Sequence, residues 1–375
     1  MKRGIKMRQK LRKIYEKNNA TVGAIYIFLK ICFIIFGRYS RFKEETNEAI
    51  QTFEGNISGF KYKKIFMKLI VYRYIYYLRA GEYYLYNFDK VPYDKRDSYM
   101  TRQLTNRYYA VINTRRFRKV LDKKNLSYKV FGKYYKRDLI CVNEEKHINR
   151  FYNFIKDKDK FILKPFSGHS GDGIEIINVK DFKTKKELFN YTLEKAPYVA
   201  EELINQSEGL GCFHKDSVNT IRVVTFYYKE DVSILWAFLR TGQGGSKVDN
   251  MGASGYGALI DEKTGTIISD GIDWKGDKEK VHPDSNITFK GFKIPKWDEL
   301  LEMVKQLSSE LSAMHCVGWD LALTDKGWVL VEGNARPQCV TIQSFTGKGY
   351  RDVYNKMYTL VKKEKEEQER KMEGE

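Results

Sequence analysis

The stretch that decides the fold is GWDLALTDKGWVLVEGN, residues 318–334. Two apolar runs flank an Asp-Lys-Gly turn, so the stretch predicts a β-hairpin. If the hairpin is centred on Lys326, Asp320 faces Glu332, with the two Cβ atoms about 5 Å apart. Asn334 lies two residues beyond Glu332 and therefore shares its face. We expect two carboxylates and one amide oxygen to converge on this face.

This set of oxygen donors predicts a site for a divalent cation. Two carboxylates that lose hydration side by side repel each other unless a cation lies between them. Mg²⁺ prefers such hard oxygen ligands and usually binds one or two carboxylates together with substrate phosphates. For either acid alone, a solvated residue on an exposed strand is the alternative. The matched register and Asn334 favour the metal site.

Composition predicts a globular protein with two or three domains or subdomains. The chain has 375 residues, of which 42% are hydrophobic and 31% are charged, so it is neither disordered nor fully embedded in a membrane. Five scattered cysteines without a C-x-x-C pair favour a reducing cytoplasm over a disulfide framework or a zinc site. No cleavable signal peptide is evident, and we expect a cytoplasmic protein.

The net charge of +19 suits an anionic partner, namely nucleic acid, an anionic membrane surface or an anionic substrate. The 27 tyrosines could stack on bases, which keeps nucleic acid as an alternative. No helix-turn-helix, zinc-finger or RNA-binding signature is present, however. We therefore expect no nucleic acid partner.

The N-terminal part combines a basic segment, residues 1–20, with a strongly apolar one, residues 22–36. The apolar segment carries Lys30 and is shorter than the roughly twenty residues that span a bilayer. Three interpretations stay open: a helix packed on the protein's own core, a basic-flanked helix in a membrane interface, and a true span. Peripheral association with the inner face of the cell membrane would then involve residues 1–40.

Apolar periodicity predicts helices over residues 62–88, 105–135 and 297–311, the second ending near Asn125 or Gly132. The last residues, 361–375, mix Lys and Glu without an apolar face, which predicts a frayed helical tail.

From residue 161 onward, short β-rich runs are broken by glycine. Residues 161–165 and 174–179 predict two strands joined by the glycine-rich loop 167–173. Strand, loop and strand form a hairpin flap rather than the strand-to-helix turn of a Rossmann or P-loop site. The loop's N–H groups can cradle anionic oxygens, and Lys164 adds a point charge for a phosphate. A plain long hairpin turn is the alternative.

Three further strands are expected over residues 198–204, 219–226 and 235–240. The last two each carry one arginine, Arg222 and Arg240. An arginine inside a sheet is costly unless an anion pairs with it. The anion could belong to a ligand, and salt bridges at the sheet edge are the alternative.

These separated blocks, in this order, resemble the ATP-grasp enzymes, and most closely the sugar-transfer-associated ATP-grasp family of polysaccharide assembly. The matching pieces are LKP with the glycine loop (163–173), VNTIR (218–222), VDN (248–250), HP (282–283), GFKIPKWD (291–298), GWD (318–320) and EGN (332–334). The resemblance covers roughly half of the chain, and the first 90 residues carry little of it. It implies an α+β ATP-grasp fold, with two subdomains that grip ATP.

The resemblance also implies which residues form the ATP site. Lys164 would hold the α- and β-phosphates. The flap that closes over the triphosphate would comprise Ser167, Gly168, His169, Ser170, Gly171 and Gly173. The adenine and ribose would be bordered by Glu201, Glu202, Leu203, Ile204 and Glu208, with Glu201 and Ile204 acting mostly through backbone groups.

For Mg²⁺ and catalysis, the resemblance implies Asp320, Glu332 and Asn334 as metal ligands. The catalytic set would be Lys164, Arg222, Arg240, Asn334 and Arg336. One departure concerns a second phosphate-binding lysine, which ATP-grasp enzymes usually carry upstream near a helix start. Here only the pair Arg115–Arg116 stands as a substitute.

We expect five regions: a basic, aromatic-rich helical part (1–90), a pre-ATP-grasp segment (91–160), a lid subdomain (161–206), a catalytic subdomain (207–360) and a charged tail (361–375). The implied activity is an ATP- and Mg²⁺-dependent carboxylate–amine ligase that acts through an acyl phosphate. Its substrate would be a sugar acid or glycan precursor of cell-surface polysaccharide, with an amine acceptor. The alternatives are a sugar or alcohol kinase with the same ATP site, and a non-catalytic ATP-binding regulator or scaffold of a membrane glycan-assembly complex.

Overall fold

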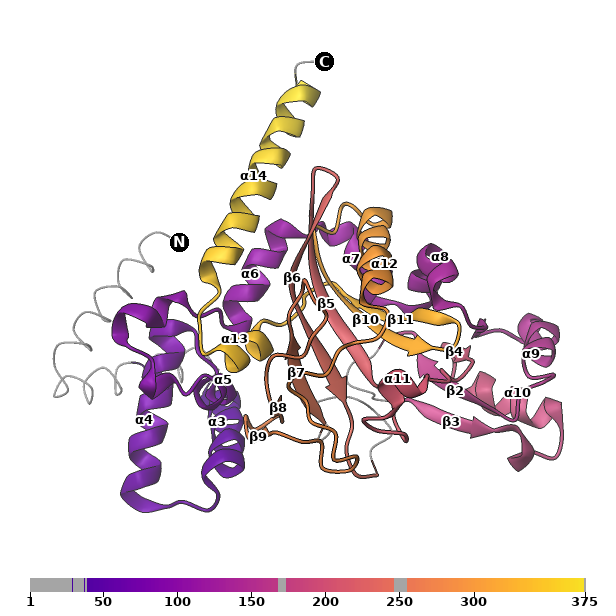
Figure 1. Cartoon of the computed structure of the whole chain (residues 1–375), viewed down its shortest axis with the longest axis horizontal. Coiled ribbons are helices and arrows are strands. Elements are labelled where there is room, and N and C mark those ends of the chain that lie inside the picture. Colours follow the sequence, from indigo (N-terminus) through magenta and orange to yellow (C-terminus); the bar gives the residue numbers. More distant parts are fainter. Residues whose placement is uncertain (1–28, 30–36, 38, 168–172, 246–254, 374–375) are drawn as a thin grey trace. The chain divides into compact units, whose positions relative to one another are not determined.

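The computed structural model describes residues 29, 37, 39–167, 173–245 and 255–373 (Figure 1). The chain divides into two compact units. Unit 1 comprises Met1–Tyr109 and Gln338–Thr359, and unit 2 comprises Ala110–Pro337 and Leu360–Glu375. Most of the apolar segment 22–36 lies outside the described residues, so its three interpretations stay open. The described helices include none that is both long and apolar enough to cross a bilayer.

Unit 1 is helical and has a core rich in tyrosine and phenylalanine. Its helices are α3 (Tyr39–Glu54), α4 (Gly59–Tyr76), α5 (Ala80–Leu85), most of α6 (Arg102–Ile112), α13 (Val340–Thr346) and the start of α14 (Arg351–Glu373). The single helix predicted over residues 62–88 is wrong, because α4 ends at Tyr76 and α5 begins only at Ala80. Tyr77 adopts a left-handed conformation, φ 60°, which ends the run of helical hydrogen bonds.

Unit 2 contains a small antiparallel sheet with the strand order β1-β4-β2-β3. Helices α9 and α10 pack their phenylalanine and leucine side chains against it. The bounds are β1 (Leu139–Val142), α9 (Ile148–Phe154), β2 (Lys160–Pro165), β3 (Glu175–Asn178), α10 (Lys185–Glu194) and β4 (Tyr198–Glu201). The predicted strand–flap–strand hairpin is thus confirmed, since β2 and β3 pair as antiparallel neighbours. The last strand is shorter than predicted and ends at Glu201.

A larger sheet of unit 2 has the order β11-β10-β5-β6-β7-β8-β9, again antiparallel. The bounds are β5 (Thr220–Tyr228), β6 (Asp231–Thr241), β7 (Tyr256–Ile260), β8 (Gly271–Ile272), β9 (Lys278–Glu279), β10 (Cys316–Thr324) and β11 (Gly327–Asn334). The accompanying helices are α7 (Arg115–Asp122), α8 (Lys124–Tyr135), α11 (Glu208–Gly211) and α12 (Trp297–Glu310). The mixed α+β prediction is confirmed, and α12 matches its predicted range to within one residue.

Helices α7, α8 and α12 cover one face of the large sheet (Figure 1). The buried side chains of Ile221, Val223 and Trp319 pack against them. Because successive strand residues point to opposite faces, Arg222 and Asp320 lie on the other face. The charged groups of the predicted site therefore share the face that these helices leave uncovered.

The hairpin β10–β11 has the predicted pairing at the key position, since Asp320 lies opposite Glu332. The turn itself differs from the prediction: Thr324 pairs with Gly327, so the loop is Asp325–Lys326 rather than a turn centred on Lys326. A bulge between Asp320 and Leu321 shifts the register by one residue and restores the predicted pair. Gly327 adopts φ 86°, which only glycine takes easily.

The predicted frayed tail is instead the end of the continuous helix α14. Val361 is fully buried, and Lys365 donates from Nζ to the carbonyl oxygen of Val111 at 2.6 Å. These contacts anchor the first turns beyond residue 360 within unit 2.

Candidate active site

A row of charged side chains crosses four strands of the large sheet. Glu332 on β11 lies opposite Asp320 on β10, and Asp320 lies opposite Arg222 on β5. Arg240 lies on β6 two residues beyond Phe238, which is the partner of Arg222, so both arginines share one face. We call Asp320, Glu332, Arg222 and Arg240 the Asp320 centre.

Asp320 is the buried anion of this centre, with a side chain only 2% exposed. Arg222 donates to both carboxylate oxygens, and Arg240 donates from Nη1 to Oδ2 at 2.7 Å. Burial opposes ionisation, yet the two guanidinium groups hold the pKa of Asp320 below its usual range. In this structure the anion that compensates both predicted arginines is Asp320.

Glu332 differs from Asp320 in both exposure and charge. Its side chain is 49% exposed, and its Oε1 lies 3.8 Å from Nη2 of Arg222. Asn334 donates from Nδ2 to the same oxygen at 3.3 Å. Partial desolvation of the half-exposed carboxyl group and the adjacent charge of Asp320 raise the pKa of Glu332. This corner of the sheet therefore carries an acid that resists ionisation until a further cation arrives.

The donor set fits Mg²⁺ by its chemistry. Among the described residues, no three Asp, Glu, His or Cys side chains form a metal-binding group. The candidate metal ligands of the Asp320 centre are therefore two carboxylates, Asp320 and Glu332, and the amide of Asn334. The charge of Asp320 contributes to the raised pKa of Glu332, while Arg222 and Arg240 oppose that effect. A hard divalent cation bound by Glu332, Asp320 and the amide oxygen of Asn334 would offset the charges of the two acids.

A second charged centre lies on the small sheet. Glu201 at the end of β4 has a side chain 3% exposed, and Lys164 on β2 places Nζ 3.0 Å from its Oε2. Arg137, just before β1, donates from Nε to Oε1 of Glu201 at 2.7 Å. Despite burial, these two cations lower the pKa of Glu201 to about 2. We call Glu201, Lys164 and Arg137 the Glu201 centre.

Lys124 lies between the two centres. It is the first residue of α8, and its backbone N–H donates to the carbonyl oxygen of Phe166, at the base of the flap, at 3.1 Å. Burial lowers the pKa of Lys124, and its charge interacts with Glu332, Lys164 and Glu201. Lys124 therefore interacts electrostatically with an acid of each centre.

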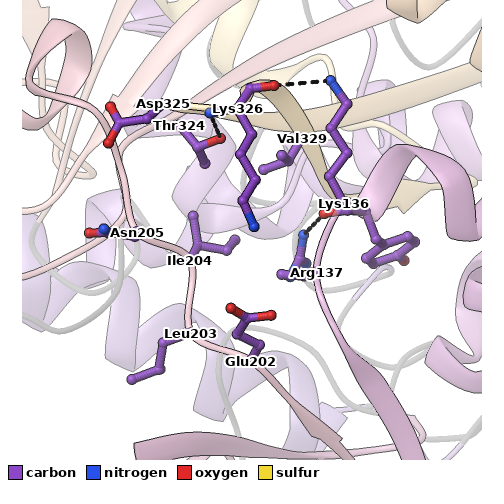
Figure 2. Close-up of a pocket in the computed structure, with 11 residues that line it drawn as sticks. Lys136, Arg137, Glu202, Leu203, Ile204, Asn205, Thr324, Asp325, Lys326 and Val329 are labelled. Atoms are coloured by element: carbon purple, nitrogen blue, oxygen red, sulfur yellow. Dashed lines mark hydrogen bonds between the residues drawn. The ribbon is translucent and has the colours of Figure 1, made fainter. Parts of the chain in front are cut away.

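A cavity of about 120 Å³ opens beside the connection that follows β4 (Figure 2). Three predicted ATP residues, Glu202, Leu203 and Ile204, line it together with Arg137 and the hairpin turn. Glu202 also accepts from the backbone N–H of Asp138 at 3.0 Å, which ties the connection to β1. The predicted adenine-binding residues thus border a cavity in unit 2.

The remaining predicted residues fall into three groups. Gly168, His169, Ser170 and Gly171 lie outside the described residues, as does the motif 248–250. Ser167 and Gly173 lie at the ends of the flap, where Gly173 adopts φ 72° and its carbonyl oxygen accepts from the Tyr198 hydroxyl at 3.4 Å. The last two are exposed: Glu208 at the start of α11 and Arg336 just after β11.

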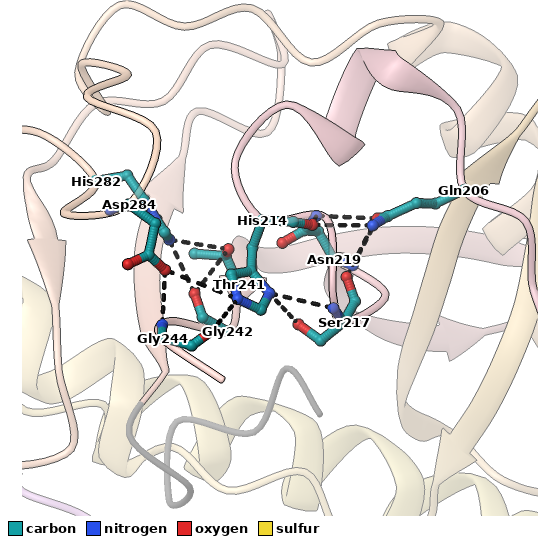
Figure 3. Close-up of polar contacts among 9 residues, drawn as sticks. All are labelled: Gln206, His214, Ser217, Asn219, Thr241, Gly242, Gly244, His282 and Asp284. Carbon is teal, nitrogen blue, oxygen red and sulfur yellow. Dashed lines mark hydrogen bonds and ion pairs between the residues drawn. The ribbon is translucent and has the colours of Figure 1, made fainter. Parts of the chain in front are cut away.

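The backbone just beyond the β6 arginine is held by two histidines and one acid (Figure 3). His282 accepts from the backbone N–H of Asp284 at 3.3 Å, so its other nitrogen carries the proton and donates to the Gly242 carbonyl at 2.8 Å. His214 lies 2.9 Å from the Gly244 carbonyl, and Asp284 accepts from the Gly244 N–H at 2.7 Å. These bonds fix the end of the strand that presents the arginine to the Asp320 centre.

Sequence reasoning missed two cations of the site, Lys124 and Arg137. The expected upstream cation was assigned to Arg115–Arg116, but both of these are exposed at the start of α7. Lys124 stands at the start of the next helix, α8, but the prediction of one helix over residues 105–135 placed it inside that helix, so no predicted helix start pointed to it. No signal pointed to Arg137, because its partner Glu201 lies 64 residues away.

Comparison with known proteins gives the family. Residues 103–358 match the family described as Sugar-transfer associated ATP-grasp. No curated protein sequence matches the chain. The match covers more than half of the chain and includes both charged centres.

Solved structures similar to this chain are ligases. D-alanine–D-alanine ligase of Helicobacter pylori is 14% identical over 64% of this chain and 61% of its own, with a TM-score of 0.39. The corresponding Bacillus anthracis ligase, solved with ATP, is 15% identical over 66% of this chain and 69% of its own, also with a TM-score of 0.39. L-Amino acid ligase of Bacillus licheniformis is 14% identical over 66% of this chain and 49% of its own, with a TM-score of 0.38. The chain thus spans less than two thirds of the first and third of these proteins. The family match nevertheless confirms the predicted ATP-grasp fold: the chain belongs to the sugar-transfer-associated ATP-grasp family.

Proposed function

We propose that the protein is an ATP- and Mg²⁺-dependent ligase that joins a carboxylate to an amine through an acyl phosphate. The observation that carries this proposal is the presence of two charged centres that differ in their balance of acids and cations. The Glu201 centre has two cations for one buried acid, whereas the Asp320 centre has two acids for two arginines. The first suits a phosphate, and the second suits a metal ion.

In this proposal ATP lies between the two centres. Lys164 and Lys124 take phosphate oxygens as point charges, and the flap closes over the triphosphate. The adenine rests against the connection Glu202–Ile204, where backbone groups and the adjoining cavity are available. Lys124 takes the place of the upstream lysine that the family resemblance calls for.

The reaction then proceeds in two displacements. An oxygen of the substrate carboxylate attacks the γ-phosphorus, the bond to the β-phosphate oxygen breaks, and ADP leaves. The amine next attacks the acyl carbon, phosphate leaves with the bonding electron pair, and the amine loses a proton. Arg222 and Arg240 orient the carboxylate and neutralise the charge that builds up, so catalysis is mainly positioning and electrostatics.

Asp320, Glu332 and Asn334 would hold Mg²⁺. When bound, the ion supplies charge neutralisation at the phosphate oxygens. Since Glu332 is half-exposed and Asp320 is fully engaged with arginines, Glu332 is the group whose ionisation the ion would change most.

The proposed substrate is a sugar acid or a glycan precursor of cell-surface polysaccharide. The family description links these proteins to sugar transfer, and the net charge of +19 favours an anionic substrate. The basic N-terminal part would add affinity for the inner face of the membrane, where such precursors are assembled.

An ADP-release screen tests the proposal. The full chain is incubated with ATP and Mg²⁺ over a panel of uronic acids and amino acids, each with and without an amine donor. We expect ADP release that requires both partners, together with an amide product by mass. Release with a sugar alone and a phosphorylated product would indicate a kinase, and no release with any pair would contradict catalysis.

A further inference from the structure

Arg137 connects three segments of unit 2 through one planar group. Its side chain is 5% exposed. Nε donates to the carboxylate of Glu201 on β4 at 2.7 Å. Nη1 donates to the carbonyl of Leu330 on β11 at 2.7 Å and to that of Tyr135 at the end of α8 at 3.0 Å. The guanidinium group of Arg137 therefore connects β4 of the small sheet with β11 of the hairpin β10–β11.

Glu201 has one more cation than it needs. A buried carboxylate that loses its only cationic partner becomes an uncompensated charge, which is strongly destabilising. Here Lys164 and Arg137 both pair with the acid, so either could leave without stranding it.

The two cations differ in their freedom to leave. Arg137 is fixed by two backbone carbonyls and lies over the Tyr135 ring, 4.8 Å from its centroid. Lys164 is a point charge on a flexible stem and is 12% exposed. Lys164 is thus the mobile partner and Arg137 the permanent one.

We propose that Arg137 is a positioning residue for ATP: it keeps Glu201 paired while Lys164 leaves that carboxylate to contact a phosphate oxygen. The inference rests on the proposed function, because it takes Lys164 as a phosphate ligand. Without Arg137, each ATP bound would leave Glu201 buried without a partner. Lys164 would then stay on the carboxylate, and ATP would bind weakly.

A double-variant cycle tests the proposal by calorimetric titration of ATP with Mg²⁺ into the full chain. Arg137→Gln is expected to weaken ATP binding by about tenfold or more, since Lys164 becomes the only partner of the acid. Glu201→Gln removes the acid and supplies the reference affinity for the combined variant. The combined variant should recover to within about threefold of Glu201→Gln, because no charge is then stranded.

Recovery of ATP affinity in the combined variant distinguishes a positioning role of Arg137 from a merely structural role. If Arg137 only supported the fold, the combined variant would bind ATP at least as weakly as Arg137→Gln. Arg137→Lys, which keeps the charge, should restore part of the affinity. Arg150→Gln, an exposed arginine on α9, is the matched control and should bind as the unmodified chain does.

Thermal unfolding of every variant is recorded alongside. If Arg137→Gln fails to fold, the combined variant decides, because it lacks the unpaired acid: binding more than about tenfold weaker than Glu201→Gln overturns the proposal. Arg137→Gln binding ATP as well as the unmodified chain overturns it too, while the proposed function stands. If the unmodified chain takes up no ATP, both the proposed function and this inference fail.

Discussion

The Asp320 centre and the Glu201 centre are built alike but balanced differently. Each contains a buried carboxylate, 2–3% exposed, that is held by two cationic side chains. Only the Asp320 centre has a second acid in cross-strand register, Glu332. The pKa values follow this difference, since that of Glu201 falls to about 2 and that of Glu332 rises.

The comparison shows how one motif can serve two ligands of opposite charge. A buried acid with a spare cation can lend that cation to a phosphate. A buried acid whose cations are already committed, with a second acid beside it, can accept a metal ion. The predictions below remove one partner at a time from each centre.

The largest effect is expected from Asp320→Asn. The substitution leaves Arg222 and Arg240 without their buried anion, so the free energy of unfolding should fall by about 3–5 kcal/mol. ADP release should fall about 100- to 1,000-fold, because the metal ligand and the aligned arginines are lost together. Asp231→Asn, at the exposed start of β6, is the control. Activity retained within about threefold would show that the Asp320 centre is only structural.

Lys164→Gln should weaken ATP binding by about tenfold to a hundredfold, the loss of one charged contact to a phosphate. Stability should change little, since Arg137 remains on Glu201. Calorimetric titration measures the affinity, with Lys160→Gln on the exposed start of the same strand as control. If Lys164→Gln and Lys160→Gln bind ATP with equal affinity, the triphosphate does not contact Lys164.

Glu332→Gln should raise the Mg²⁺ concentration for half-maximal activity by about tenfold or more, as expected when a metal ligand is lost. The same variant should be more stable than the unmodified chain without metal at neutral pH. The reason is that the folded chain loses stability as pH rises from the ordinary pKa of a glutamate through the raised pKa of Glu332. Thermal unfolding in EDTA and in Mg²⁺ measures the stability of the variant and of the unmodified chain under each condition. If Glu332→Gln is less stable than the unmodified chain in EDTA, the assignment of Glu332 as a metal ligand is contradicted.

The last prediction concerns acid stability. The pKa of Glu201 lies at about 2 in the folded chain, below its ordinary value of 4.5. The stability that its ionised form contributes is therefore complete above pH 4.5 and is lost as pH falls toward 2, on the order of 3 kcal/mol in total. Denaturant unfolding between pH 5 and 3 should show a steeper loss for the unmodified chain than for Glu201→Gln. Parallel curves would mean that folding leaves the pKa of Glu201 unchanged.

The sequence was sufficient for features that depend on local pattern. The pairing of Asp320 with Glu332 was predicted although the turn was placed one residue away, because the bulge after Asp320 absorbs the difference. The strand–flap–strand element and helix α12 were predicted from periodicity and glycine placement. The break at Tyr77 was not, since the residues on both sides are equally apolar and aromatic.

Contacts between distant segments account for what the sequence did not reveal. Arg222 and Asp320 are 98 residues apart, and only the pairing of β5 with β10 sets them opposite each other. Arg137 meets Glu201 and Leu330 across 64 and 193 residues. Local periodicity carries no information about such pairs. The strands that carry Arg222, Asp320, Glu201 and Leu330 had been predicted, but not their neighbours in the sheet. The strand β1 that follows Arg137 had not been predicted.

The central claim is that one centre takes the phosphates of ATP while the other takes the divalent cation beside them. Calorimetric titration of the unmodified full chain with ATP, once in Mg²⁺ and once in EDTA, tests it most directly. The account predicts one ATP per chain and an affinity that drops when Mg²⁺ is removed. A folded chain that takes up no ATP, or that binds it equally well in EDTA, would contradict the account.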